Sequence, residues 1–318
     1  MASCNPAYSE GFRGEALRRD KQMLKPIFLA FLAVAAMSGA TLAQDSDVTP
    51  LDATSQAWAA PVPPFRIADN LFYVGAADIT SYVVATREGL ILIDGGFAQM
   101  APQIVANLHA LDFDIHDVRI ILTTHAHYDH VGAIAELKRL SGAQLYVSAA
   151  DAEQMARGGH GDFAFGDRFL FPPERADHIL HDGEVVRLGE AHLTAHITPG
   201  HTRGCTTWSI PLRVGERTLS AVDICSVTAP GYRLSRNAAY PNIVSDFRAT
   251  FRRLSDLQCD IPLGSHGNFF DLTEKRRRLQ RPAQGNPFVD PAGCRRTIEN
   301  ARVAFEAQLA RQQQAPAP

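Results

Sequence analysis

The chain has 318 residues, of which 46% are hydrophobic and 20% are charged, with a formal net charge of −3 at pH 7. This is an ordinary globular balance, and the length suits one large domain or two small ones. The slightly acidic charge argues against a nucleic-acid or anionic-surface partner, so neither is expected.

An export signal is predicted at the N-terminus. Residues 27–37 (IFLAFLAVAAM) form an apolar run that follows two lysines and precedes small residues. These are the three parts of a secretory signal peptide, and the run is too short for an ordinary membrane span. A buried helix is the alternative, but no polar face supports it. Residues 1–43 are therefore predicted to be a leader, with Met23 as a possible true start. Residues 44–318 would be the mature periplasmic domain, with no membrane attachment after cleavage.

The first half of the mature chain alternates between strand and helix patterns. Alternating or continuous apolar runs bounded by turn residues predict strands, and apolar residues at helical spacing predict helices. Strands are predicted at 71–76, 81–96 (two strands with a turn at Arg87–Gly89), 117–124 and 143–149, and helices at 101–113, 131–142 and 151–159.

The second half repeats this order after a loop rich in glycine and phenylalanine at 158–173. Strands are predicted at 184–189, 191–200, 205–212, 218–224 and 259–266, and helices at 245–258 and 293–311. Two successive sets of strands and helices favour two sheets packed face to face with helices outside. The predicted fold class is α+β, an αββα sandwich of two mixed sheets.

Four cysteines remain after the leader, an even number that suits an oxidising compartment. A hairpin that turns near Gly215 would bring Cys205 opposite Cys225, and cross-strand neighbours lie within disulfide reach. Cys259 and Cys294 would then form the second pair. Four cysteines allow three connectivities, and four buried free thiols are the alternative, so this pairing is a hypothesis.

The segment THAHYDHVG, residues 124–132, crowds three histidines and one aspartate directly after a predicted buried strand. His125 and His127 would point to the same side of an extended segment, so one ion can take both. Asp129 and His130 follow in the next helix and suit a second ion. Imidazole and carboxylate are zinc ligands, whereas a polar loop with chance histidines is the alternative.

Two further histidines complete the set of candidate ligands. His201 lies in TPGHTRG and His266 in LGSHGN, each in a glycine-flanked turn after a predicted strand. Loops on a rigid scaffold usually carry function, so three strand ends would supply six ligands. The histidines expected to be ordinary surface or core residues are His109, His116, His178, His181, His192 and His196.

With these motifs the chain resembles the metallo-β-lactamase superfamily, and within it the subclass B3 metallo-β-lactamases, over Trp58–Arg311. The superfamily motifs appear here as HAHYDH, TPGHTRG and LGSHGNFFDL. Subclass features appear as APGY at Ala229–Tyr232, ADAEQMARGG with FGD, NPFVDPAGC, and a cysteine pair corresponding to Cys259 and Cys294. The resemblance implies the αββα fold described above.

The resemblance also implies two zinc ions and their ligands. It assigns three residues to each ion: the first zinc to His125, His127 and His201, and the second to Asp129, His130 and His266. Ser226 occupies the place of a cysteine ligand in another subclass. A one-residue shift in the alignment would put Cys225 there instead.

The activity implied is β-lactam hydrolysis by a monomer, which would give antibiotic resistance. A zinc-bound hydroxide oriented by Asp129 would open the lactam ring of penicillins, cephalosporins and carbapenems. The Tyr232 hydroxyl would help to stabilise the oxyanion. Ser226 and Thr228 would bind the substrate carboxylate. Asp94 would fix a ligand histidine, with a capping role as its alternative.

The same resemblance gives the loop 158–173 a place beside the zinc ions. Its glycines allow movement, and we expect it to lie over the groove that binds substrate. Phe163 and Phe165 are candidate substrate contacts, whereas Phe169 and Phe171, next to two prolines, are expected to be core residues.

A different hydrolase of the same fold is the main alternative. Glyoxalase II-like thioesterases and acyl-homoserine lactonases use an aspartate that bridges both zinc ions, for which Asp223 is the candidate here, although Ser226 is preferred. The motifs of serine hydrolases and serine β-lactamases are absent from the sequence. Purely structural zinc is disfavoured because structural sites are closed by four protein ligands, whereas each triplet leaves room for water.

Overall fold

The computed structural model describes residues 48–281 and 285–314. The predicted leader, residues 1–43, lies outside these ranges, so its export role stays a prediction. Among the described residues, no helix combines the length and the hydropathy that a membrane span requires.

The first half of the chain forms a seven-stranded mixed sheet in the order β1-β2-β3-β4-β5-β6-β7. Neighbouring strands are antiparallel from β1 to β4 and parallel from β4 to β7. The strands are β1 (Phe65–Ala68), β2 (Leu71–Tyr73), β3 (Tyr82–Thr86), β4 (Gly89–Ile93), β5 (Val118–Leu122), β6 (Gln144–Ser148) and β7 (His178–Leu180).

The second half forms a five-stranded mixed sheet in the order β12-β11-β10-β9-β8. Its strands are antiparallel except for the parallel pair of β11 and β12. The strands are β8 (Val185–Leu188), β9 (Ala191–Ile197), β10 (Thr206–Val214), β11 (Arg217–Ile224) and β12 (Ile261–Gly264).

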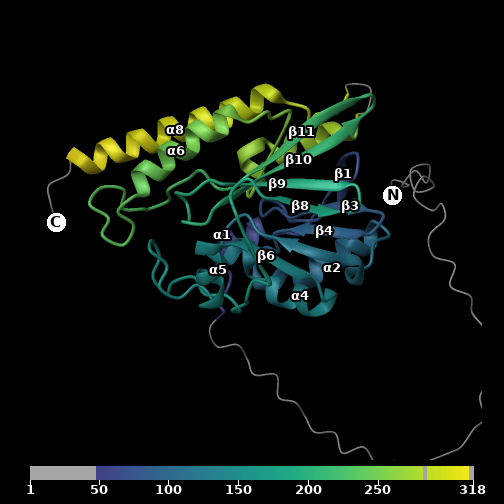
Figure 1. Ribbon diagram of the computed structural model, residues 1–318, viewed down its shortest axis with the longest axis horizontal. Coiled ribbons are helices and arrows are strands. Elements are labelled where there is room, and N and C mark those ends of the chain that lie inside the picture. Colours follow the sequence, from purple (N-terminus) through teal and green to yellow (C-terminus); the bar gives the residue numbers. More distant parts are fainter. Residues whose placement is uncertain (1–47, 282–284, 315–318) are drawn as a thin grey trace, which may run out of the picture. The chain divides into compact units, whose positions relative to one another are not determined.

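Helices cover the outer faces of both sheets, as Figure 1 shows. Helices α2, α4 and α5 pack on the first sheet, and α6 and α8 pack on the second. The α-helices are α1 (Ala53–Trp58), α2 (Ala101–Ala110), α3 (Tyr128–Val131), α4 (Ile134–Ser141), α5 (Ala149–Ala156), α6 (Ile243–Asp256), α7 (Leu272–Leu279) and α8 (Pro291–Gln314). Short 3₁₀ helices are η3 (Ala98–Met100), η4 (Ile115–Asp117) and η5 (Gly267–Phe270). The predicted αββα sandwich is therefore confirmed.

Strand β5 is apolar except at Arg119, which is exposed. Ile120 and Leu122 point into the core between the two sheets, whereas Val118 and Ile121 point into the core beneath the helices. Residues that are buried on either face of a strand are apolar, so the exposed Arg119 is the one charged residue of β5. Across the sandwich, the buried Trp208 of β10 donates its indole N–H to the carbonyl of Thr123, 3.1 Å away. This bond ties the second sheet to the end of β5, directly before the histidine cluster.

The apolar residues that predicted the helices lie on the buried faces of those helices in the structure. Phe247, Phe251 and Leu254 lie buried on one face of α6, and the ring of Phe247 packs 4.7 Å from that of Phe305 in α8. Helix α4 ends at Gly142, which adopts a left-handed conformation with φ of 71°. Glycine adopts that conformation without steric cost and is therefore a common helix terminator.

Two disulfides join the predicted partners, Cys205 with Cys225 and Cys259 with Cys294. The ladder of β10 and β11 pairs Trp208 with Asp223, so the first disulfide lies just beyond its last paired residues. The second disulfide ties Cys259, shortly before β12, to Cys294 near the start of α8. The bonded Cys225 has no thiolate to offer a metal, so the alternative of a cysteine ligand is excluded in this structure.

Removing either disulfide should lower the free energy of unfolding by about 3–4 kcal/mol in the chain-entropy model. The two closed loops span 20 and 35 residues. The variants are the Cys205→Ala/Cys225→Ala pair and the Cys259→Ala/Cys294→Ala pair, measured by denaturant unfolding. Peptide mapping under non-reducing conditions provides the control, and free thiols in the exported protein would contradict the pairing.

Candidate metal centre

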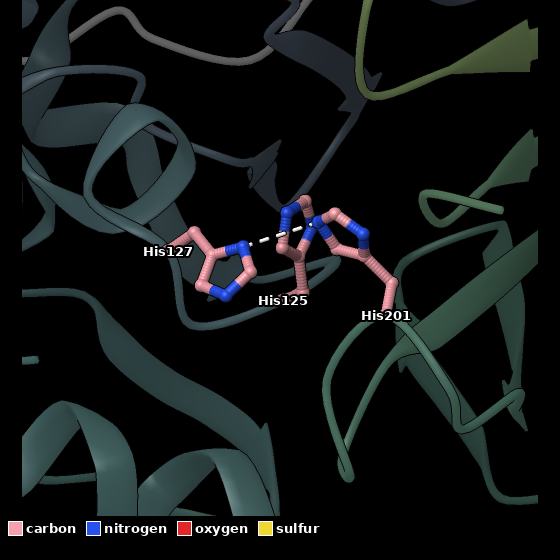
Figure 2. A group of neighbouring side chains, drawn as sticks. All are labelled: His125, His127 and His201. Carbon is pink, nitrogen blue, oxygen red and sulfur yellow. Dashed lines mark hydrogen bonds between the residues drawn. The ribbon is translucent and has the colours of Figure 1, made fainter. Parts of the chain in front are cut away.

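Three predicted ligands, His125, His127 and His201, converge at one edge of the sandwich (Figure 2). One ring nitrogen from each lies within 4.8 Å of those of the others. Nδ1 of His127 and Nε2 of His201 are 3.1 Å apart. His125 and His127 follow β5 of the first sheet, whereas His201 follows β9 of the second. All three side chains are buried, so this first triad joins the two sheets at their edge.

The backbone around Ala126 differs from the extended segment that was expected. The N–H of His127 donates to the carbonyl of His125, 3.1 Å away, which makes a tight turn. The N–H of Ala126 donates to Oδ2 of Asp151 at 2.9 Å and thereby fixes the turn. The two imidazole rings still meet, with centroids 5.0 Å apart. Their proximity therefore comes from the turn and not from strand geometry.

The second predicted set, Asp129, His130 and His266, also comes together. Asp129 and His130 lie on the short helix α3, and His266 follows β12 of the second sheet. Oδ2 of Asp129 is 3.4 Å from Nε2 of His130 and 3.6 Å from Nε2 of His266. His125 also converges with Asp129 and His130 within 4.8 Å, so it lies between the two groups.

Outer partners hold two of these histidines in a fixed orientation. Nδ1 of His266 donates to Oδ2 of Asp78 at 2.8 Å, and Nδ1 of His201 donates to the carbonyl of Thr228 at 2.8 Å. Each bond leaves Nε2 directed towards the cluster, the arrangement that orients histidine ligands in metal sites. Asp78 was missed by the sequence analysis because no local motif marks it.

Asp94 lies behind the cluster, as the resemblance implied. Its carboxylate accepts the N–H of Thr124 at 2.7 Å and the hydroxyl of Thr124 at 2.6 Å. Oδ2 of Asp94 is also 3.7 Å from Nδ1 of the buried His130. This position suits a residue that holds a ligand histidine, and that role stays a prediction.

Asp151 links the two loops that carry the first triad, and the sequence analysis missed it. Its carboxylate accepts three bonds of 2.9 Å, from the N–H of Ala126, the hydroxyl of Thr202 and the N–H of Gly204. A Cβ at Gly204 would lie 2.6 Å from Cγ of Asp151, so glycine allows this close approach. Asp151 is therefore a buried clamp between the segments before His127 and after His201.

Several atoms of the cluster fit a metal cation. Both ring nitrogens of His130 are buried without a hydrogen-bond partner among the described residues, and Nδ1 of His127 faces Nε2 of His201. Buried polar atoms are normally paired, and unpaired imidazole nitrogens in a converging donor set suit a cation. A set of imidazole nitrogens and one carboxylate matches the preference of zinc.

The electrostatics of the cluster agree with this fit. Burial lowers the pKa of His125 and of His201 well below the ordinary value, so both imidazoles are neutral at pH 7. Burial opposes ionisation of Asp129, but His130 beside it holds the pKa of that carboxyl well below its usual range. Burial likewise acts to lower the pKa of His130, yet Asp129 raises it to about 10. At pH 7 His130 is thus protonated beside the ionised Asp129, and a metal ion that binds there takes the place of that proton.

The candidate substrate-binding residues lie beside the first triad. The hydroxyls of Ser226 and Thr228 are 3.0 Å apart on the loop after β11. Tyr232 is buried, its ring stacks on that of His201 with centroids 5.6 Å apart, and its hydroxyl donates to the carbonyl of His201 at 2.9 Å. That proton is engaged in this structure, so a role of Tyr232 towards an oxyanion stays a prediction.

The loop 158–173 reaches the first triad through Phe165. Its ring centroid lies 5.5 Å from that of His127, so Phe165 remains a candidate substrate contact. Phe163 packs against Tyr232 and Tyr240 in the core shared with α6 and α8, and Phe165 also contacts Tyr232 at the edge of this core.

The two phenylalanines expected in the core have different surroundings. Phe171 is 3% exposed and belongs to the core beneath the first sheet, as predicted. Phe169 is only partly buried, and its ring stacks on that of Tyr128 at 4.5 Å.

Asp223, the candidate bridging aspartate of the alternative hydrolases, lies within β11. It is fully buried, and both carboxylate oxygens lack a hydrogen-bond partner among the described residues. Burial, together with the nearby Asp94, raises the pKa of Asp223 well above its ordinary value. An uncharged carboxylic acid is a poor metal ligand, and Asp223 is not among the residues whose ligand atoms converge on either group.

Comparisons with known proteins agree with this geometry. A sequence profile described as the metallo-β-lactamase superfamily matches residues 74–214. The chain is 44% identical to a metallo-β-lactamase of Cronobacter sakazakii described as having a HARLDQ motif, with a TM-score of 0.79 over 82% of this chain and 100% of that one. BJP-1, a subclass B3 metallo-β-lactamase of Bradyrhizobium japonicum, is 35% identical, with a TM-score of 0.77 over 81% of this chain and 97% of that one.

A different hydrolase matches a shorter part of the chain. A hydroxyacylglutathione hydrolase of Fuscovulum blasticum is 32% identical over 111 residues, which are 35% of this chain and 36% of that protein.

The HAHYDH motif of this chain differs from the corresponding motif of the Cronobacter protein at two positions. Where the Cronobacter protein has Arg and Gln in HARLDQ, this chain has His127 and His130 in HAHYDH. The prediction of a metallo-β-lactamase-type hydrolase fold is confirmed by the identity and coverage of the solved structures. The chain therefore belongs to the metallo-β-lactamase superfamily and is similar to its subclass B3 members.

Proposed function

We propose that the mature chain is a zinc-dependent β-lactamase of the subclass B3 type, which opens the lactam ring of penicillins, cephalosporins and carbapenems. The observation that carries this proposal is the pair of converging donor groups, with His125 between them, next to the hydroxyls of Ser226 and Thr228. The similarity to BJP-1 over nearly its full length supports the subclass.

The donor groups would hold two zinc ions. Zinc, when bound, acts as a Lewis acid and lowers the pKa of bound water to near neutrality. The proposed ligands are His125, His127 and His201 for the first ion, and Asp129, His130 and His266 for the second.

The side chains around the ions would orient the reactants. The ionised Asp129 only accepts hydrogen bonds, so it would orient the attacking water. Ser226 and Thr228 carry neighbouring hydroxyls that can both donate to the substrate carboxylate. Asp78 and the carbonyl of Thr228 would keep His266 and His201 in place as ligands.

Export to the periplasm is part of the proposal. The signal-like residues 1–43 support it, as do the two disulfides, because disulfides persist in oxidising compartments. The substrate is a small molecule, and we propose that the enzyme acts as a monomer.

A thioesterase or lactonase of the same fold is the second candidate. The partial match to hydroxyacylglutathione hydrolase favours it. The carboxyl of Asp223 is fully buried and has no hydrogen-bond partner in the described part of the chain, which disfavours this candidate, because a bridging aspartate must be ionised and must reach the metal ions.

Hydrolysis of a penicillin, a cephalosporin and a carbapenem by the purified mature chain tests the proposal. We expect turnover of all three, loss of turnover after chelation, and recovery after zinc is added, with two zinc ions per chain by metal analysis. Clavulanate-type serine inhibitors should have little effect. A glutathione thioester and an acyl-homoserine lactone are the comparison substrates, and robust thioester hydrolysis without β-lactam turnover would overturn the proposal.

A further inference from the structure

Asp162, on the loop 158–173, faces a ring nitrogen of His127. Its Oδ2 lies 3.5 Å from Nε2 of His127, and the Asp162 side chain is only 8% exposed. That nitrogen has no hydrogen-bond partner among the described residues. On the other side of the same ring, Nδ1 faces Nε2 of His201 at 3.1 Å. The imidazole of His127 therefore lies between the first triad and a buried loop carboxylate.

The backbone of the loop fixes the direction of this carboxylate. Oδ1 of Asp162 accepts the N–H groups of Ala164 and Phe165, each at 2.8 Å. Asp162 and Gly166 also exchange two backbone hydrogen bonds of 3.1 and 2.9 Å. The same tight turn presses the ring of Phe165 against that of His127. One short turn thus presents both an anionic and an aromatic group to a single imidazole.

We propose that Asp162 is a positioning residue for His127 and that it couples metal retention at the first triad to the closed position of the loop 158–173. The inference rests on the metal centre of the proposed function. A histidine that binds a metal through one nitrogen carries its proton on the other and usually donates it to a carboxylate or carbonyl. The ligands His201 and His266 have such partners in Thr228 and Asp78, and Asp162 is the corresponding partner of His127.

The coupling has a direction. While the loop is closed, Asp162 orients the His127 ring and increases the basicity of its metal-binding nitrogen. When the loop opens, that partner is lost and the first ion is held less tightly. Because coupling between two equilibria is reciprocal, a bound first ion also favours the closed loop. The loop would then control the metal as well as cover the substrate.

The same loop offers a matched control in Asp167. Its Oδ1 accepts the N–H of Gly161 at 2.8 Å, so it also supports the loop backbone. The Asp167 side chain is 67% exposed and lies 3.4 Å from Nδ1 of His160, which is not a proposed ligand. The substitutions Asp162→Asn and Asp167→Asn therefore remove the same charge from the same loop, and only the first one faces the triad.

Zinc titration of the metal-free mature chain against a competing chelator tests the inference. We expect Asp162→Asn to weaken binding of one of the two ions by about 10–100-fold, the usual effect of losing an outer partner of a ligand. The other ion should bind as in the wild type, and Asp162→Glu should recover part of the loss. Asp167→Asn should bind both ions as the wild type does. In a His201→Ala background, which disrupts the first triad, Asp162→Asn should have no further effect on zinc affinity.

Several outcomes would overturn the inference. Three of them concern zinc affinity: Asp162→Asn binds zinc as the wild type does, Asp167→Asn loses as much affinity as Asp162→Asn, or Asp162→Asn still lowers the affinity in the His201→Ala background. The fourth is that metal-free Asp162→Asn unfolds at a lower temperature than metal-free Asp167→Asn. The last result would make Asp162 a structural residue only. A wild type that binds zinc but does not hydrolyse β-lactams would overturn the proposed function and leave this inference standing. A wild type that binds no zinc would overturn both.

Discussion

Replacing His201 with alanine should remove one zinc ion and reduce β-lactam turnover by more than about 100-fold, the upper end of the loss seen when only an outer partner of a metal ligand is removed. His201 is the one residue of the first triad that follows a strand of the second sheet. Its side chain is buried, and its Nε2 lies 3.1 Å from Nδ1 of His127. Its loss leaves two imidazoles that follow the same strand, too few ligands to hold zinc firmly.

The matched variant is His266→Ala, which makes the same change at the other donor group. We expect each variant to retain one zinc by metal analysis, but at different sites. Cobalt substitution separates the sites, because the ion left in His266→Ala would have three nitrogen ligands, whereas the ion left in His201→Ala would have two nitrogens and one carboxylate. Two firmly bound zinc ions in both variants would show that the ligand assignment is wrong.

Truncating Asp151 to alanine should lower the free energy of unfolding by about 3 kcal/mol or more. The carboxylate is 2% exposed and accepts three hydrogen bonds. Each buried donor left unsatisfied costs about 1–3 kcal/mol. The turn at Ala126 and the segment after His201 would also lose their shared partner, so zinc affinity at the first triad should fall as well.

Denaturant unfolding and zinc titration of the Asp151→Ala variant measure both effects. Asp177→Ala is the control, because Asp177 also accepts a backbone N–H, that of Leu145 at 2.8 Å, but its side chain is 41% exposed and lies outside the cluster. That variant should lose less stability and bind zinc normally. An Asp151→Ala protein as stable as the wild type, with unchanged zinc affinity, would show that the clamp has no such role.

The layers of the fold and the proposed ligands could be predicted because their signals are local. The run at β5 is apolar except at the exposed Arg119, since its other residues are buried, and α6 presents Phe247 and Phe251 on one face. His201 and His266 lie in the loops that follow β9 and β12, where the sheet edge gathers loops that are far apart in sequence.

The outer partners of the ligands could not be predicted because they act across long stretches of chain. Asp78 meets His266 over a separation of 188 residues, and Asp151 meets Gly204 over 53. Neither carboxylate carries a local pattern that distinguishes it from an exposed aspartate. The turn at Ala126 was also unforeseen, since it depends on Asp151 and not on the residues around it.

Each proposed zinc ion would take two ligands from the segment after β5 and one from the second sheet. An ion at either position is therefore a removable cross-link between two layers that side-chain packing and a few hydrogen bonds also hold together. Binding to the folded chain alone stabilises it by about 4 kcal/mol at a zinc concentration 1,000 times the dissociation constant, and by nothing when zinc is absent. The resistance of the protein to unfolding and proteolysis would then follow the zinc supply of its surroundings. Zinc depletion would then destabilise the protein as well as remove the ions that the proposed activity needs.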